Sequence, residues 1–231
     1  ALAFGTFAEC ANVIVGPGNR WVTAAKKYLA GEVGIDGLAG PSELLVLADQ
    51  HADAAMIAAD LLAQAEHDPE AVPLLVTDCE QLVAAVEDEL QLQLDTLSTA
   101  ETARAALANH GAAAVVGNLE EAVALANQIA PEHLEVCVAD PAAITDRLSA
   151  YGSMFVGARS AEVFGDYGAG PNHVLPTGGG SRFQAGLSVV SFLRPLTYLD
   201  LDDASLLAAD AAQLARLEGL EAHARAAVRR L

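Results

Sequence analysis

The sequence is poor in aromatic and basic residues. Phenylalanine, tryptophan and tyrosine make up only 5% of its 231 residues, so the 53% of hydrophobic residues must build a core from aliphatic side chains and alanine. Lysine and arginine total 12 against 31 aspartates and glutamates, which gives a formal net charge of -19. A surface this acidic argues against binding to nucleic acids or to anionic membranes. The composition fits a soluble enzyme.

Cysteines and long apolar runs are also scarce. Cys10, Cys79 and Cys137 are odd in number and widely spaced, and no CxxC pattern is present. This argues against a disulfide framework and favours a reducing cytoplasm. No apolar run approaches the roughly 18 residues that a membrane span requires. The chain lacks the basic start of a signal peptide and begins inside an apolar segment without a methionine, so we expect further sequence before it.

Short apolar runs alternate with amphipathic stretches between residues 11 and 158. The apolar runs predict strands at residues 13–16, 43–48, 73–77, 112–117, 134–139 and 153–158. The amphipathic stretches predict helices at residues 20–30, 54–66, 80–109, 119–130 and 142–149. Asp53 is a candidate N-cap for the second of these helices. The alternation predicts an α/β fold with a mostly parallel sheet and helices on both faces.

The pattern changes near residue 164. Residues 164–186 are rich in glycine and proline and have no periodicity, which is typical of a functional loop. Two helical segments are expected after it, at about residues 202–208 and 210–229. Their small size predicts a helical C-terminal appendage to the α/β domain.

Gln64 and His67 lie three residues apart near the end of a predicted helix, so both side chains project from one face. This spacing suits two ligands of one metal ion, for which histidine is a common donor. Asp166 and His173 lie in the glycine-rich loop, where aspartate is a good oxygen ligand. Taken alone, a QxxH pair is more often a helix surface than a metal site.

Glu132 and His133 occupy a predicted helix-to-strand junction. Histidine can take a proton at neutral pH and a neighbouring glutamate can activate water, although a polar surface corner is the commoner explanation of such a pair. Sites in open α/β sheets gather at the carboxyl ends of strands, so a site at the other end needs a further explanation. The GPGN segment at residues 16–19 could meet a cofactor phosphate or ribose. Ser42, in a tight turn, is a candidate polar contact.

Six segments together closely resemble the histidinol dehydrogenase family in their order, their spacing and the identity of their residues. They are GPGNRWVTAAKK, IDGLAGPSELLVLAD, DLLAQAEHDPEA, APEHLEV, FGDYGAGPNHVLPT and EGLEAH. The resemblance covers nearly the whole chain and implies an incomplete Rossmann-like α/β fold with a small helical C-terminal appendage. HDPEA and IDGLAG differ from the HGP and IDMPAG motifs that are more usual in the family, but neither change removes a residue matched to a zinc ligand.

The resemblance implies a zinc site. In the family, one Zn2+ ion per subunit is held by side chains that match Gln64, His67, Asp166 and His223 of this sequence. An open position remains for the amino alcohol, which the ion orients and polarises. The same four residues are therefore expected to contact the substrate.

The resemblance also implies a reaction, the NAD-linked four-electron oxidation of L-histidinol to L-histidine through a bound aldehyde, which is the last step of histidine biosynthesis. His133 would remove the hydroxyl proton as hydride leaves for NAD and would act again in the second oxidation. Glu132 would help to activate water between the two steps. Ser42, His133 and Glu218 match substrate contacts of the family, and Asn19 matches an NAD contact.

Family enzymes are homodimers in which the C-terminal segment reaches into the partner's site. The resemblance therefore places Glu218 and His223 across an interface from the other ligands. On this basis residues 1–39 are the remaining part of an NAD-binding Rossmann-like domain, residues 40–188 the main α/β domain with the zinc and catalytic residues, and residues 189–231 a small dimer-contacting segment. L-histidinol is the expected small-molecule partner, with no nucleic acid, no membrane and a cytoplasmic location.

The resemblance matches the C-terminal half of the family chain, so roughly the N-terminal half, with further cofactor contacts, is absent. We therefore expect these 231 residues alone to lack normal dehydrogenase activity. Two alternatives are a paralogue that oxidises another polar alcohol with the same machinery and a metal-binding remnant without catalysis. Glu218 and His223 favour the histidinol enzyme, and the retained Glu132 and His133 argue against a pure binding module.

Overall fold

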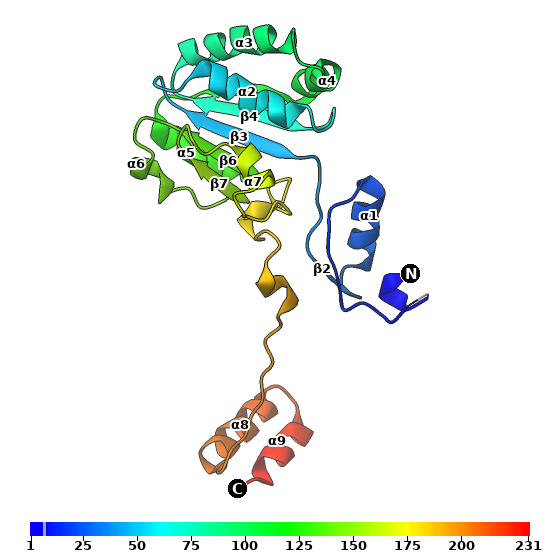
Figure 1. Ribbon diagram of the computed structural model, residues 1–231. Coiled ribbons are helices and arrows are strands. Elements are labelled where there is room, and N and C mark those ends of the chain that lie inside the picture. Colours follow the sequence, from blue (N-terminus) through cyan, green and yellow to red (C-terminus); the bar gives the residue numbers. More distant parts are fainter. Residues whose placement is uncertain (7) are drawn as a thin grey trace. The chain divides into compact units, whose positions relative to one another are not determined.

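The computed structural model describes residues 1–6 and 8–231 (Figure 1). Contacts within the chain divide it into two units, Ala1–Phe192 and Leu193–Leu231. The first unit carries a parallel sheet with its helices, and the second is a pair of helices. The finer domain boundaries expected from the sequence stay predictions.

The main sheet confirms the predicted α/β fold. Its strands are all parallel and follow the order β5-β4-β3-β6-β7. They are β3 (Glu43–Ala48), β4 (Val72–Thr77), β5 (Ala112–Val115), β6 (His133–Cys137) and β7 (Ser153–Val156). The helices between and after them are α2 (Ala54–Ala65), α3 (Glu80–Leu94), α4 (Ala100–His110), α5 (Leu119–Ile129), α6 (Ala142–Thr145) and α7 (Glu162–Asp166).

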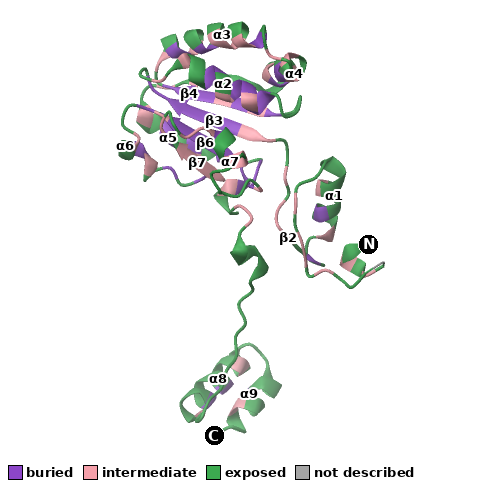
Figure 2. Ribbon diagram, in the orientation of Figure 1, coloured by how far each residue is buried: buried purple, intermediate pink, exposed green. Residues whose placement is uncertain are grey.

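Strand β3 separates two hydrophobic cores. Leu44 and Val46 pack with residues of α2 and α3, whereas Leu45 and Leu47 pack with residues of α5 and α6. Successive side chains of a strand point to opposite faces. A central strand covered on both faces is therefore apolar throughout, and Figure 2 shows β3 buried along almost its whole length.

Side-chain caps set the start of two helices that frame the sheet. Asp53 accepts hydrogen bonds from the N–H groups of Ala55 and Met56, as its N-cap position predicts, and begins α2. Asn118 accepts one from the N–H of Glu121 and begins α5. Each cap satisfies backbone donors that the first helical turn leaves without a partner.

The single helix predicted over residues 80–109 is wrong, because the structure has two helices there. Helix α3 ends at Leu94 and α4 begins at Ala100, with Thr99 at the N-cap position. The intervening residues include aspartate, serine and threonine, whose side chains compete for backbone hydrogen bonds and favour caps and turns over helix interiors. The apolar periodicity continues through this turn, which is why the pattern alone does not reveal it.

The N-terminal part of the first unit forms a small β-α-β element. β1 (Val13–Ile14) and β2 (Gly34–Ile35) pair in parallel, and α1 (Arg20–Leu29) connects them. The buried Lys26 of α1 lies 2.6 Å from Asp36, which also accepts the N–H of Gly16. This ion pair ties the loop before α1 to the end of β2.

The C-terminal unit consists of α8 (Ser205–Leu217) and α9 (Glu221–Val228), which lie against each other. The helix break expected near residue 209 is therefore wrong, since it falls at residues 218–220. Gly219 has a φ of 76° there, a left-handed conformation that glycine adopts without a Cβ penalty and that commonly ends helices.

Several large apolar side chains of this second unit face solvent. They include Tyr198, Leu199, Leu206, Leu214 and Leu217. Within the described ranges, none of the helices is long and apolar enough to cross a membrane.

Candidate active site

Two polar turns meet at the amino edge of the sheet. Ser42 directly precedes β3, and Glu132 directly precedes β6. The two strands are parallel neighbours with Leu44 opposite His133, so their first residues lie side by side. This pairing brings the PSE and PEH segments together although they are 90 residues apart in the chain.

Glu132 is held by two donors from the start of β3. Its Oε2 accepts the hydroxyl of Ser42 and the backbone N–H of Glu43, both at 2.9 Å. The carboxyl group is mostly buried, so these bonds fix its orientation in a place where a free carboxylate would be costly.

His133 is oriented by the same turn. Its Nδ1 lies 3.0 Å from the backbone carbonyl oxygen of Glu43. A carbonyl oxygen can only accept, so this contact assigns the proton to Nδ1 and leaves Nε2 as the basic nitrogen of the neutral ring. The imidazole is therefore preset to take a proton at Nε2.

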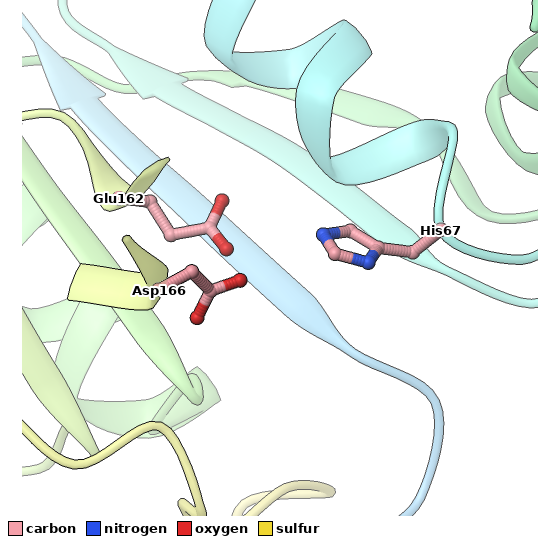
Figure 3. A group of neighbouring side chains, drawn as sticks. All are labelled: His67, Glu162 and Asp166. Carbon is pink, nitrogen blue, oxygen red and sulfur yellow. The ribbon is translucent and has the colours of Figure 1, made fainter. Parts of the chain in front are cut away.

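A second group of polar side chains comes from two helices on one face of the sheet. Helix α2 follows β3 and returns across the sheet, which brings its C-terminal end, with Gln64 and His67, back towards the amino edge. Helix α7 packs near α2 and supplies Glu162 and Asp166. One ligand atom from each of His67, Glu162 and Asp166 lies within 4.8 Å of the others (Figure 3).

Gln64 joins the two groups. Its side chain is fully buried, and its Oε1 lies 3.4 Å from the hydroxyl oxygen of Ser42, whose single proton is donated to Glu132. Among the described residues, its Nε2 has no hydrogen-bond partner. A buried amide without its full set of partners is unusual in a structural position and points to a functional one.

Glu162 and Glu43 are site residues that the sequence analysis missed. Glu162 lies four residues before Asp166, a spacing that puts both side chains on one face of a helix. Glu162 lies just before the glycine-rich segment at residues 164–186, and the five-residue α7 is too short to show a periodicity that would reveal it. Glu43 holds Glu132 and His133 through its backbone N–H and carbonyl groups, which no side-chain pattern can signal.

Burial shifts the pKa values of Glu132 and His133 in opposite directions, and each shift favours the neutral form. It raises the pKa of Glu132 to about 7, with a further rise from the Glu43 and Asp166 carboxylates and an opposing effect of the two hydrogen bonds. It lowers the pKa of His133, which favours the neutral ring. A neutral imidazole beside a carboxyl group that titrates near neutral pH suits repeated proton transfer.

The glycine-rich segment lies against this edge of the sheet through hydrogen bonds to both turns. Gly40 donates its N–H to the Thr177 hydroxyl, and Gly178 donates to the Glu43 carboxylate, at 2.6 and 2.7 Å. Ser181 donates to the carbonyl oxygen of Pro131. The segment expected to be a functional loop thus helps to fix the turns that carry Ser42 and Glu132.

The backbone of Glu132 passes so close to residue 152 that only glycine fits there. A Cβ at this position would lie 2.5 Å from the carbonyl oxygen of Glu132, a backbone atom that cannot move aside cheaply. We expect Gly152→Ala to lower both the unfolding midpoint and the activity of the protein, since overpacking of this kind typically costs about 1–3 kcal/mol. Gly37→Ala is the control, because its Cβ would meet only the Gln184 side chain at 3.7 Å. Equal unfolding midpoints for the two variants would contradict this reading.

A buried acid pair lies on the same face of the sheet, beyond His133. Glu135 accepts the N–H of Glu162 at 2.7 Å, and burial together with the nearby Asp60 carboxylate raises the pKa of Glu135 from 4.5 to about 8. The folded state therefore holds this proton more tightly than the unfolded state. Its contribution to the free energy of unfolding decreases as the pH rises from about 4.5 to about 8.

We expect Glu135→Gln to flatten the decline of stability over this pH range. The amide keeps the acceptor for the Glu162 N–H and has no proton to lose. Urea unfolding at several pH values measures the effect, and Glu87→Gln on the exposed side of α3 is the control. A variant whose free energy of unfolding falls with pH as steeply as the parent's would contradict the assignment of the slope to Glu135.

The remaining predicted residues lie away from these two groups or in the second unit. Asn19 is the N-cap of α1, where its Oδ1 accepts the N–H groups of Trp21 and Val22. Glu218 is the C-cap residue of α8, and His223 lies on α9. The ligand role of His223 and the substrate role of Glu218 stay predictions, as do the roles of the other site residues.

Comparison with known proteins bears on the whole chain. The family model described as histidinol dehydrogenase matches residues 1–231. The chain belongs to the histidinol dehydrogenase family. Histidinol dehydrogenase of Zymomonas mobilis is 47% identical over all of this chain, and that of Geobacillus kaustophilus is 51% identical over 98% of it.

The solved structures agree with this membership. The crystal structure of histidinol dehydrogenase from Elizabethkingia anophelis superposes with a TM-score of 0.91 at 37% identity and covers 99% of this chain. The match covers 54% of that structure's chain and the same share of the two curated relatives. This member of the histidinol dehydrogenase family therefore spans about half the length of the proteins it resembles.

Proposed function

We propose that the protein containing this chain oxidises L-histidinol to L-histidine with NAD, and that the site at the amino edge of the sheet carries the proton transfers. The observation that supports this most directly is the contact between His133 Nδ1 and the Glu43 carbonyl oxygen, which leaves a basic Nε2 in a buried site. Membership of the histidinol dehydrogenase family supplies the reaction class.

The side chains around His67 fit a zinc ion. Zinc takes nitrogen and carboxylate ligands at about 2.0–2.2 Å in tetrahedral geometry, so two of its ligand atoms lie about 3.3–3.6 Å apart. The ligand atoms of His67 and Asp166 already lie within 4.8 Å, and a small side-chain movement would bring them to one ion. Gln64 and His223 would complete the set of four zinc ligands with His67 and Asp166. When bound, zinc would orient and polarise the amino alcohol.

His133 acts as the general base of the proposed reaction. Its Nε2 accepts the hydroxyl proton of L-histidinol as hydride leaves the carbon, and the Nδ1–H bond to Glu43 holds the ring in place. NAD supplies the hydride acceptor in both oxidation steps. The first step releases one proton and gives the aldehyde, which stays in the site.

Glu132 serves the hydration between the two oxidations. Its carboxyl group has a pKa of about 7, so it can take a proton from water as the water adds to the aldehyde carbon. The former aldehyde oxygen takes up the proton that His133 holds, which completes the hydrate and returns His133 to its neutral form, while Glu132 passes its proton to solvent. His133 then accepts a hydroxyl proton of the hydrate as the second hydride leaves. The product is a carboxylic acid, which ionises to the carboxylate of L-histidine.

The C-terminal unit supports a homodimer with shared sites. Its two helices are too small to bury a core of their own, and leucines of α8 such as Leu206 and Leu217 are mostly exposed. Such a unit is expected to pack against another surface, and a second copy of the protein supplies one. In this arrangement Glu218 and His223 would bind the substrate and zinc of the partner's site, and Asn19 would contact NAD.

A comparison of substrates tests the proposal. The protein expressed from the whole reading frame that contains this chain should reduce NAD with L-histidinol at a kcat/KM far above that with other amino or sulfonated alcohols. A preference for another polar alcohol would identify a paralogue with the same machinery. Zinc binding without turnover of any alcohol would contradict the proposed activity.

A further inference from the structure

Glu162 lies between the two groups of the candidate site. Only 4% of the residue is exposed, and its Oε1 is 3.7 Å from Nδ1 of His133. The same side chain shares the cluster with His67 and Asp166, and Figure 3 shows its carboxyl group directed towards the space between them. It therefore faces both the proposed base and the proposed metal ligands.

The carboxyl group of Glu162 accepts no hydrogen bond from the described residues, whereas Glu132 and Glu135 each have one oxygen that does. Glu132 accepts an N–H and a hydroxyl group, and Glu135 accepts the N–H of Glu162 itself. Among the described residues, no hydrogen bond reaches the carboxylate oxygens of Glu162, and the 3.7 Å contact to His133 is too long to be one. Burial of a carboxylate in this condition is unfavourable unless a positively charged partner compensates for it or the group takes up a proton.

The protein itself fixes Glu162 in this position. Glu135, on β6 two residues after His133, accepts the N–H of Glu162 at 2.7 Å in a buried hydrogen bond. Alternation along the strand places Glu135 and His133 on one face, so the bond anchors α7 beside the imidazole. A buried carboxyl group that is anchored through its backbone and left without a partner is preset for a ligand.

We propose that Glu162 is a cation-binding residue of this site. Two sources of positive charge fit the position: the metal ion held by His67 and Asp166, and the ammonium group of the amino-alcohol substrate. The inference rests on the proposed function, because both cations belong to it. Either cation would give the carboxylate the partner that the chain itself does not provide.

Two substitutions separate a charge role from a packing role. Glu162→Gln keeps the size of the side chain and removes its charge, whereas Glu162→Asp keeps the charge and shortens the side chain. A residue that binds a cation should tolerate aspartate better than glutamine. A residue that only fills space should tolerate glutamine better, so the order of the two variants is itself a result.

The experiment uses protein from the whole reading frame and has two measurements. The first is the affinity for Zn2+ without substrate, measured by competition with a chelator. The second is the affinity of the zinc-saturated protein for L-histidinol without NAD, measured by calorimetry. We expect Glu162→Gln to weaken one of them by about 10–100-fold, the range known for residues that support a metal site. Glu87→Gln is the control and should change neither.

The results distinguish the two cations and the two proposals. Weaker zinc binding by Glu162→Gln assigns the residue to the metal, and weaker L-histidinol binding with unchanged zinc affinity assigns it to the ammonium group. Unchanged values in both measurements, or a glutamine variant that binds better than the aspartate variant, overturn the inference. If His67→Ala then still weakens zinc binding, the proposed metal site stands without Glu162. Wild-type protein that binds neither cation overturns both proposals.

Discussion

Replacement of His133 by asparagine is expected to lower kcat for the oxidation of L-histidinol by about 10²–10⁴-fold, the usual contribution of a general base. The asparagine amide can take the place of Nδ1 and donate to the Glu43 carbonyl oxygen, so the local structure should survive. No atom of asparagine replaces Nε2. A fall in kcat would therefore be caused by the loss of the basic Nε2 and not by a change in the fold. Steady-state kinetics of the complete protein measures it.

The matched control is His110→Asn. His110 ends α4 at the surface, where its ring lies 3.3 Å from the Glu70 carboxylate. This variant should keep the parent kcat, and both variants should unfold near the parent's temperature. A His133→Asn protein that turns over within a few-fold of the parent rate would remove His133 from the reaction.

Replacement of His67 by alanine is expected to remove most of the zinc affinity and, with it, the activity. His67 supplies a nitrogen donor to the proposed ion, and the loss of a direct ligand should exceed the roughly 10–100-fold cost of losing an outer partner. The residue is exposed at the end of α2, so its removal should leave the cores intact. Chelator competition measures the affinity, and His51→Ala, an exposed residue outside the zinc cluster, is the control. Unchanged zinc affinity would contradict the assigned ligand.

The His67→Ala variant also tests the shared site. If His223 enters the partner's site, a mixed dimer of His67→Ala and His223→Ala subunits contains one site with both histidines and one with neither. Random mixing of the two inactive proteins should then restore about one quarter of the parent activity. No recovery in a mixture shown to contain mixed dimers would contradict a site shared across the interface.

The sequence was sufficient for the elements with strong local signals. The apolar run at β3 and the Asp53 cap of α2 predicted both elements closely, because a buried central strand and a capped helix have distinctive patterns. The break between α3 and α4 was missed, since apolar periodicity runs through a turn that only its capping residues mark. Local patterns also could not provide the strand order, which depends on pairing between distant segments.

The candidate site was predictable where its residues form a motif. The Glu132–His133 pair and the spacing of Gln64 and His67 were visible in the sequence, and the structure places Ser42 between Glu132 and Gln64. The unexpected position of the site at the amino edge has a simple cause. Parallel strands begin at one edge, and α2 returns its last turn to that edge. Glu162 could not be found, because its role depends on a backbone bond to Glu135 across the fold.

The ratio of NADH formed to L-histidinol consumed tests the account most directly. His133 serves two hydride losses and Glu132 serves the hydration between them, so the complete protein should form two NADH and one L-histidine for each L-histidinol. A ratio of one with release of the aldehyde would contradict the role of Glu132 in hydration at this site. No NADH formation by zinc-loaded protein would contradict the proposed function itself.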